Sequence, residues 1–164
     1  MINNNFVSIV LAGINNDTLP NTLKLKSGNY NPDGASWTAS LATPLTKATT
    51  GDSVNDSGTY LIFGNGNTPD NDYSLSSEIT SGLKCNTMNR AFTKSGIIYT
   101  STITNDSSNP ITITEIGLCE DYCSSANSSY YAQAIIGREE IEPITLQPGD
   151  TKSFTYKINL SVEE

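Results

Sequence analysis

The sequence contains no histidine, and this absence excludes several kinds of active site. A Ser-His-Asp or Cys-His nucleophile, a His-ligated zinc ion and a His-based proton switch all need an imidazole ring. Cysteine is also scarce: Cys85, Cys119 and Cys123 are an odd number, so a monomer keeps at least one thiol. Cys119 and Cys123 can close a small disulfide or line a loop. Free thiols are favoured over this disulfide, because secreted domains that depend on disulfides contain more cysteine. No metal site is predicted.

Charged residues are few, and those of positive sign are scattered. The chain has nine Lys and Arg against 17 Asp and Glu, a net charge of −8, and no basic run. A phosphate-binding surface needs clustered cations, so nucleic acid is not an expected partner. The apolar stretch 6–14 is too short for a membrane span and has no basic flank, so neither a membrane anchor nor an export signal is predicted.

The polar character comes instead from Asn, Ser and Thr, a composition typical of extracellular or virion β proteins. A length of 164 residues suits one domain with a small N-terminal annex. We place this annex at residues 1–57 and the main domain at residues 58–164.

The annex is predicted to hold a short helix, a strand and an extended arm. Residues 1–14 fit either a helix or a strand, and the helix is favoured because Asn3–Asn5 can cap its start and Gly13 its end. Residues 22–26 alternate as a strand does. Residues 30–57 are long and irregular, so Tyr30, Trp37 and Leu41 are the predicted partner-contact residues. The alternative is a solvated loop pinned by Trp37.

The main domain is predicted to be an antiparallel β-sandwich of immunoglobulin-like or jelly-roll-like kind. The clearest strand, 152–163, places five apolar side chains on one face: Phe154, Tyr156, Ile158, Leu160 and Val162. Gly96–Thr104 shows the same alternation, and Pro148-Gly149 forms a turn. Further strands are predicted at 60–63, 111–114, 130–136 and 143–146.

Three finer predictions concern the connections. Residues 80–91 read as a polar bridge that carries Cys85, and Arg138-Glu139-Glu140 reads as a solvated corner. Asn105–Pro110 reads as a turn that brings 111–114 back as the partner of 96–104. The apolar parity changes after Ile113, which predicts a β-bulge or a crossing between sheets near Glu115.

Three runs, taken together, resemble a known pattern. They are FGNGNTP with DYSL (63–75), ITITEIGL (111–118) and PITLQPGD continuing to Tyr156 (143–156). In this order they are similar to small virion proteins encoded in the structural modules of tailed bacteriophages, over roughly residues 58–160. The chain departs from the pattern at Cys119, where an aromatic or aliphatic residue is usual, and at Gln133, where an arginine is usual. The second departure implies the loss of an ion pair with an acidic neighbour such as Glu115.

The resemblance implies a structural role in the virion, with no catalysis and no cofactor. The expected partners are other virion proteins, namely the major capsid protein or neck and tail proteins, together with further copies of the chain. The expected function is a capsid accessory, decoration or head-fibre-attachment protein.

Two other functions fit parts of the sequence. One is a carbohydrate-binding module of a tail or fibre, with stacking residues Tyr30, Trp37, Tyr60, Tyr73, Tyr130 and Tyr131. The other is a glycosidase that pairs Glu115 with Glu139 or Glu140, and it is the least favoured because Glu115 is better explained as a strand residue.

Overall fold

This computed structural model describes residues 2, 4–7, 59–66, 73–124 and 127–159, and the side chains among them except those of 121–132. The predicted contact residues Tyr30, Trp37 and Leu41 lie outside these ranges. So does the predicted strand at 22–26.

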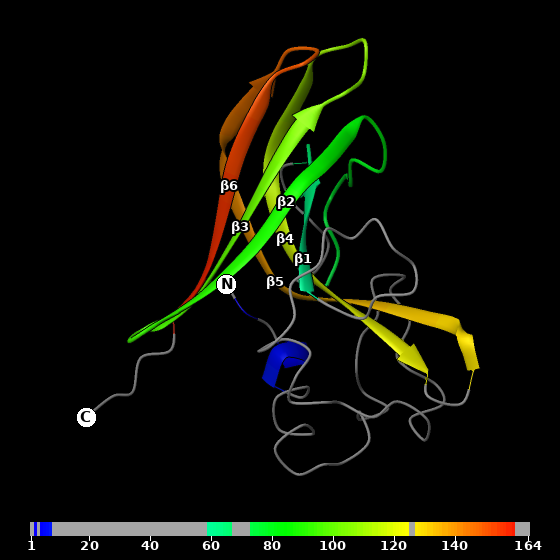
Figure 1. Ribbon diagram of the computed structural model, residues 1–164, viewed down its shortest axis with the longest axis vertical. Coiled ribbons are helices and arrows are strands. Elements are labelled where there is room, and N and C mark those ends of the chain that lie inside the picture. The colour runs from blue at the N-terminus through cyan, green and yellow to red at the C-terminus, as the bar shows by residue number, and fades with distance from the viewer. Residues whose placement is uncertain (1, 3, 8–58, 67–72, 125–126, 160–164) are drawn as a thin grey trace.

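The described chain forms two antiparallel sheets of three strands each, which lie face to face (Figure 1). One sheet has the order β1-β4-β5 and the other the order β2-β3-β6. The strands are β1 (Thr59–Gly64), β2 (Leu83–Thr93), β3 (Gly96–Asn105), β4 (Ile111–Ser124), β5 (Asn127–Leu146) and β6 (Thr151–Asn159). The prediction of a mainly β, antiparallel sandwich is confirmed.

The core lies between the two sheets and takes side chains from both. Phe63 of β1 meets Phe154 of β6 with ring centroids 5.0 Å apart and the rings tilted by 60°, an arrangement favoured between aromatic side chains. In β6 the inward residues Phe154, Tyr156 and Ile158 are buried, while their neighbours are exposed. Leu160 and Val162 lie outside the described residues. The alternation in the sequence therefore identified the buried face of this strand.

The predicted N-terminal helix is seen at residues 4–7. Phe6 of this turn is buried against the main core. The side-chain amide of Asn5 is also buried and donates a hydrogen bond to the carbonyl of Ile135, 3.1 Å away. Burial of Phe6 and this hydrogen bond thus fix the turn on the sandwich.

Two predictions about the strands were wrong. Residues 83–91, read as part of a polar bridge, belong to β2 (Leu83–Thr93), and the corner at 138–140 lies inside the single long strand β5. In β2 the register shifts between Cys85 and Thr87, so Leu83 and Cys85 on one side of the shift and Met88 on the other do not follow one parity. A bulge in a half-buried edge strand thus hides the period-2 signal on which the reading depended.

The path from β3 to β4 also differs from the prediction. Residues 106–110 do not close a hairpin but carry the chain from one sheet to the other. Asn105, which is fully buried, organises this crossing: its side-chain amide donates to the carbonyls of Asn109 (2.8 Å) and Leu146 (2.9 Å). Its backbone accepts from Gly149 N–H at 2.7 Å and donates to the carbonyl of Asp150 at 2.9 Å. One residue thus joins both crossings at this end of the sandwich.

Candidate functional site

The most concentrated polar arrangement in the described chain surrounds Glu115. The predicted bulge is confirmed here, because the β4–β5 register shifts between Ile113 and Glu115. The shift turns the carboxylate of Glu115 to the outer side of the β1-β4-β5 sheet, yet the side chain is fully buried. A buried carboxylate must be paired or hydrogen-bonded, so its partners define the site.

Backbone N–H groups of the segment after β1 supply the first partners. Oε1 of Glu115 accepts from Gly66 at 3.3 Å and from Ser77 at 3.2 Å, and Oε2 accepts from Ser76 at 3.2 Å. The same segment pairs with β1 through the bonds from Asn65 N–H to the carbonyl of Ser77 and from Ile79 N–H to that of Phe63, both 2.9 Å. Glu115 therefore holds both ends of this loop against the sheet.

Arg138 of β5 supplies the charge. Its Nε and Nη2 each lie 3.2 Å from Oε2 of Glu115, and Nη2 also lies 3.1 Å from Oε1 of Glu140. The expectation of a lost ion pair at Glu115 was therefore wrong, because Arg138 takes the role expected of a residue at position 133. Gln133 instead donates from Nε2 to the hydroxyl of Tyr60 at 2.7 Å.

Close packing explains why Gly64 and Gly117 of the first two runs are glycines. A Cβ on Gly64 would lie 2.4 Å from Oε1 and 2.7 Å from Cγ of Glu115. A Cβ on Gly117 would lie 2.8 Å from Cγ1 of Ile62 and 3.2 Å from Cδ2 of Leu75. The first two runs of the pattern, about 50 residues apart in the chain, thus meet around one carboxylate. We call Glu115, Arg138 and Gly64, together with residues 65–66 and 76–77 that they hold, the Glu115 clamp.

The geometry of the clamp tests the glycosidase alternative, in which Glu115 pairs with Glu139 or Glu140. Glu115 and Glu140 share a single guanidinium, and Glu139 lies on the opposite parity of β5. Glu139 lines an open groove of about 620 Å³ along the β5–β6 margin, whose other lining residues are Ile2, Thr155, Lys157, Ile158 and Asn159. Among the described residues that line this groove, Glu139 is the one carboxylate, whereas hydrolysis of a glycoside uses two that face each other.

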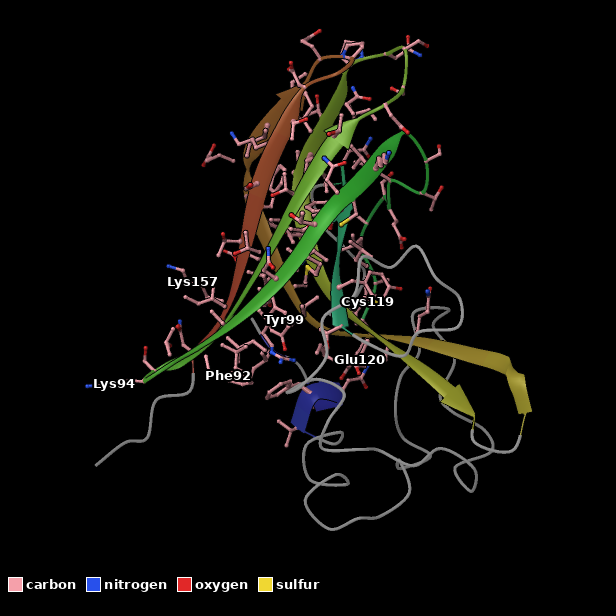
Figure 2. All side chains as sticks on the ribbon, viewed as in Figure 1. Phe92, Lys94, Tyr99, Cys119, Glu120 and Lys157 are labelled. Atoms are coloured by element: carbon pink, nitrogen blue, oxygen red, sulfur yellow. The ribbon has the colours of Figure 1, made fainter. Side chains whose placement is uncertain are left out.

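A second buried polar group lies between the sheets. Glu120 of β4 accepts a hydrogen bond from the hydroxyl of Thr59, and both residues are fully buried. Tyr99 of β3 lies near Glu120 (Figure 2). Burial, together with the charge of Glu120, raises the pKa of Tyr99 to about 12, although Arg90 and a hydrogen bond with Thr59 act in the opposite direction. Burial also raises the pKa of Tyr156.

The remaining aromatic residues divide between core and surface. Tyr60, one of the predicted sugar-stacking residues, is 7% exposed and packs with Ile62, Leu75, Cys119 and Ile135, so that role is wrong for this side chain. Tyr73 is partly buried, and the other candidates fall outside the described side chains. Phe92, which sequence reasoning missed, is 61% exposed and lies under the guanidinium of Arg90, 4.9 Å from Cζ to the ring centroid.

Arg138 and the backbone donors of the clamp were also missed. Charge alone does not reveal them, because Arg138 stands beside two glutamates in a stretch that resembles an exposed corner. Cys85 and Cys119 are thiols. Among the described residues, no three acidic or cysteine side chains gather as metal ligands would.

Comparisons with known proteins identify no relative of this chain. No family model matches it, and neither the curated proteins nor the solved structures contain a match. Within the described ranges, no helix is long and apolar enough to cross a membrane.

Proposed function

We propose that the chain is a structural component of a tailed-bacteriophage virion, a capsid accessory, decoration or head-fibre-attachment protein that acts through protein–protein contacts. One observation carries the proposal: two of the runs that resemble such proteins converge on the Glu115 clamp. Residues that contact one another in the fold form a coherent structural signature, whereas chance similarities along the chain have no reason to meet.

The third run supports the same interpretation. In PITLQPGD, Gln147 N–H donates to Oδ2 of Asp150 at 2.8 Å, and Gly149 adopts a φ of 86°. Glycine adopts this left-handed backbone conformation without steric cost. The turn therefore requires the glycine that the run supplies at position 149. The turn connects β5 to β6 and is joined to Asn105. All three runs therefore serve the framework of the sandwich.

The use of buried charge favours a scaffold role as well. Glu115 and Glu120 contact backbone donors, a guanidinium or a neighbouring hydroxyl, and each joins strands or loops to one another. In this proposal the protein has no catalytic activity and no cofactor. Its function depends on the surfaces that the framework presents to other virion proteins.

The test is to locate the protein in purified particles. Mass spectrometry of gradient-purified virions should detect the chain at a fixed copy number per major capsid protein, and a particle reconstruction should show a β-sandwich at its position. Absence of the chain from washed particles would contradict the proposal. A glycan array with the isolated protein distinguishes the carbohydrate-binding alternative, for which binding to defined sugars is required.

A further inference from the structure

The two sheets carry opposite charge, although the chain as a whole is acidic. β2, β3, β6 and the Lys94-Ser95 turn contain five of the nine Lys and Arg and no Asp or Glu; these cations are Lys84, Arg90, Lys94, Lys152 and Lys157. β1, β4 and β5 contain six acids and one cation, namely Glu115, Glu120, Asp121, Arg138, Glu139, Glu140 and Glu142. The charge of the sandwich is therefore divided between its two sheets.

The exposed members of each set define two surfaces. Lys84 and Lys157 lie on the outer parity of the β2-β3-β6 sheet, and Lys94 lies at the tip of the β2–β3 hairpin; all three are exposed. Figure 2 shows Lys94 and Lys157 near the same end of this sheet. We call these three lysines and the hydroxyls between them the basic face.

The surface of opposite charge lies on β5. Glu139, Glu140 and Glu142 are exposed on this strand, which is the margin of the β1-β4-β5 sheet in the described chain. We call these three residues the acidic edge. Arg138 shares its guanidinium between Glu115 and Glu140, and Lys157 lines the same groove as Glu139, so Glu139 and Glu142 are the members of this edge that Arg138 does not contact.

The hydroxyls of the basic face reduce the cost of covering it. Thr102 bonds Ser153 at 2.7 Å and Thr104 bonds Thr151 at 2.7 Å across the β3–β6 pair. Each pair satisfies one O–H within the face, so fewer polar groups lose a partner when water leaves. A similar pair, Thr112 with Thr145 at 2.8 Å, lies on the β1-β4-β5 sheet.

We propose that the basic face of one copy docks on the acidic edge of a second copy. The proposal deepens the proposed function, since it rests on a protein that works through protein contacts, and it names the partner and the surfaces. Because the two surfaces differ, the contact is heterologous and repeats from copy to copy, giving a ring or a filament. A two-fold contact of the basic face with itself would bring like charges together and is disfavoured.

The area available predicts a weak contact. Three strands about 4.8 Å apart and about nine residues long span about 400 Å², below the roughly 800 Å² per partner of a standard interface. Self-association of the isolated chain should therefore be reversible and weakened by salt, since exposed charge pairs are screened.

The test uses the full chain and two charge-reversed variants in sedimentation velocity. One carries Lys84→Glu, Lys94→Glu and Lys157→Glu; the other carries Glu139→Lys and Glu142→Lys, which leaves Glu140 in contact with Arg138. Each variant alone should associate about tenfold or more weakly than the original chain, and an equimolar mixture should recover association. Recovery follows because each variant retains the surface that now complements the other.

A matched control separates position from charge. Lys152→Glu makes the same change as Lys157→Glu on the same strand but on the other parity, and only Lys157→Glu should weaken association. Thermal unfolding confirms that each variant is folded. An original chain that stays monomeric at about 1 mM, or a mixture that associates no better than its components, overturns the proposal. Whether the chain belongs to the virion is measured on purified particles, and self-association is measured on the isolated chain. Either proposal can therefore fail while the other holds.

Discussion

The two sheets of this sandwich are built by different rules. The β2-β3-β6 sheet buries one face: buried and more exposed residues alternate in β3 from Ile97 and in β6 from Ser153, and the β3–β6 pair has no register shift. The β1-β4-β5 sheet is buried on both faces in its β1 region, where every residue from Thr59 to Gly64 is buried, and its β4–β5 pair contains three register shifts. A sheet with one wet face satisfies its polar groups with water. A sheet covered on both faces needs internal partners, and here the Glu115 clamp supplies them.

The largest expected effect comes from breaking the clamp. Glu115→Ala removes the acceptor of three backbone N–H groups and leaves Arg138 without its buried partner, which should lower the free energy of unfolding by about 3–5 kcal/mol. Urea unfolding measures the loss. Glu142→Ala, an exposed acid on the same sheet, should change stability by less than about 0.5 kcal/mol. Equal losses for the two variants would show that the clamp is not what stabilises this sheet.

High pH tests the inner face of the β2-β3-β6 sheet. Tyr99 keeps its proton to a pKa of about 12, whereas in the unfolded chain it ionises near pH 10. Between these values the unfolded state binds fewer protons, so stability is fully present below pH 10 and falls as pH rises toward 12, by about 2–3 kcal/mol.

Chemical unfolding at a series of pH values from 8 to 12 measures this slope. Tyr99→Phe should remove part of it and leave the contribution of Tyr156, whose pKa is also raised. A slope unchanged by Tyr99→Phe would contradict the assignment to Tyr99.

A smaller effect is expected from crowding the clamp. Gly64→Ala places a Cβ against the carboxylate of Glu115 and should cost about 1–3 kcal/mol. Combining it with Glu115→Ala removes the atoms that the Cβ would meet. In the double-mutant cycle the alanine at position 64 should therefore cost clearly less than in the original chain. Additive losses would mean that Gly64 is required for another reason.

The smallest effect is expected on the outer hydroxyl pairs. Thr102→Ala removes one partner of the Thr102–Ser153 hydrogen bond on an exposed surface and should lower stability by about 0.2–1 kcal/mol. Thr112→Ala, which breaks the Thr112–Thr145 pair on the other sheet, is the matched variant. Similar small losses of stability from both variants would mean that the outer hydroxyl pairs contribute equally to the two sheets. The two sheets would then differ in stability only through their buried side chains. A loss from either as large as that of Glu115→Ala would contradict this.

The sequence predicted the regular strands with one buried face better than the strands that contain a bulge or follow a crossing between the sheets. Strands with one buried face were identified from alternation alone, as in β3 and β6, and the parity change located the bulge at Glu115. The strand β2 was missed because its own bulge breaks the alternation. The crossing at 106–110 was read as a hairpin, since a turn sequence does not say whether the next strand joins the same sheet.

The candidate site was less accessible than the fold. Glu115 was noticed for its position, but its partners are backbone groups of a loop about 40–50 residues away in the chain, together with an arginine flanked by glutamates. Backbone donors leave no signal in residue type, and the pairing of Glu115 with Arg138 depends on the register between two neighbouring strands. Such an arrangement emerges only when the register of β4 with β5 is known.

The β4–β5 hairpin extends beyond the body of the sandwich (Figure 1), and past Glu120 the described part of β4 pairs with β5 alone. Its length is therefore set independently of the core. Adding two residues to each strand would lengthen this arm by about 7 Å and leave every existing side chain on its original side. The reach of the hairpin can in this way be changed without redesign of the domain that carries it.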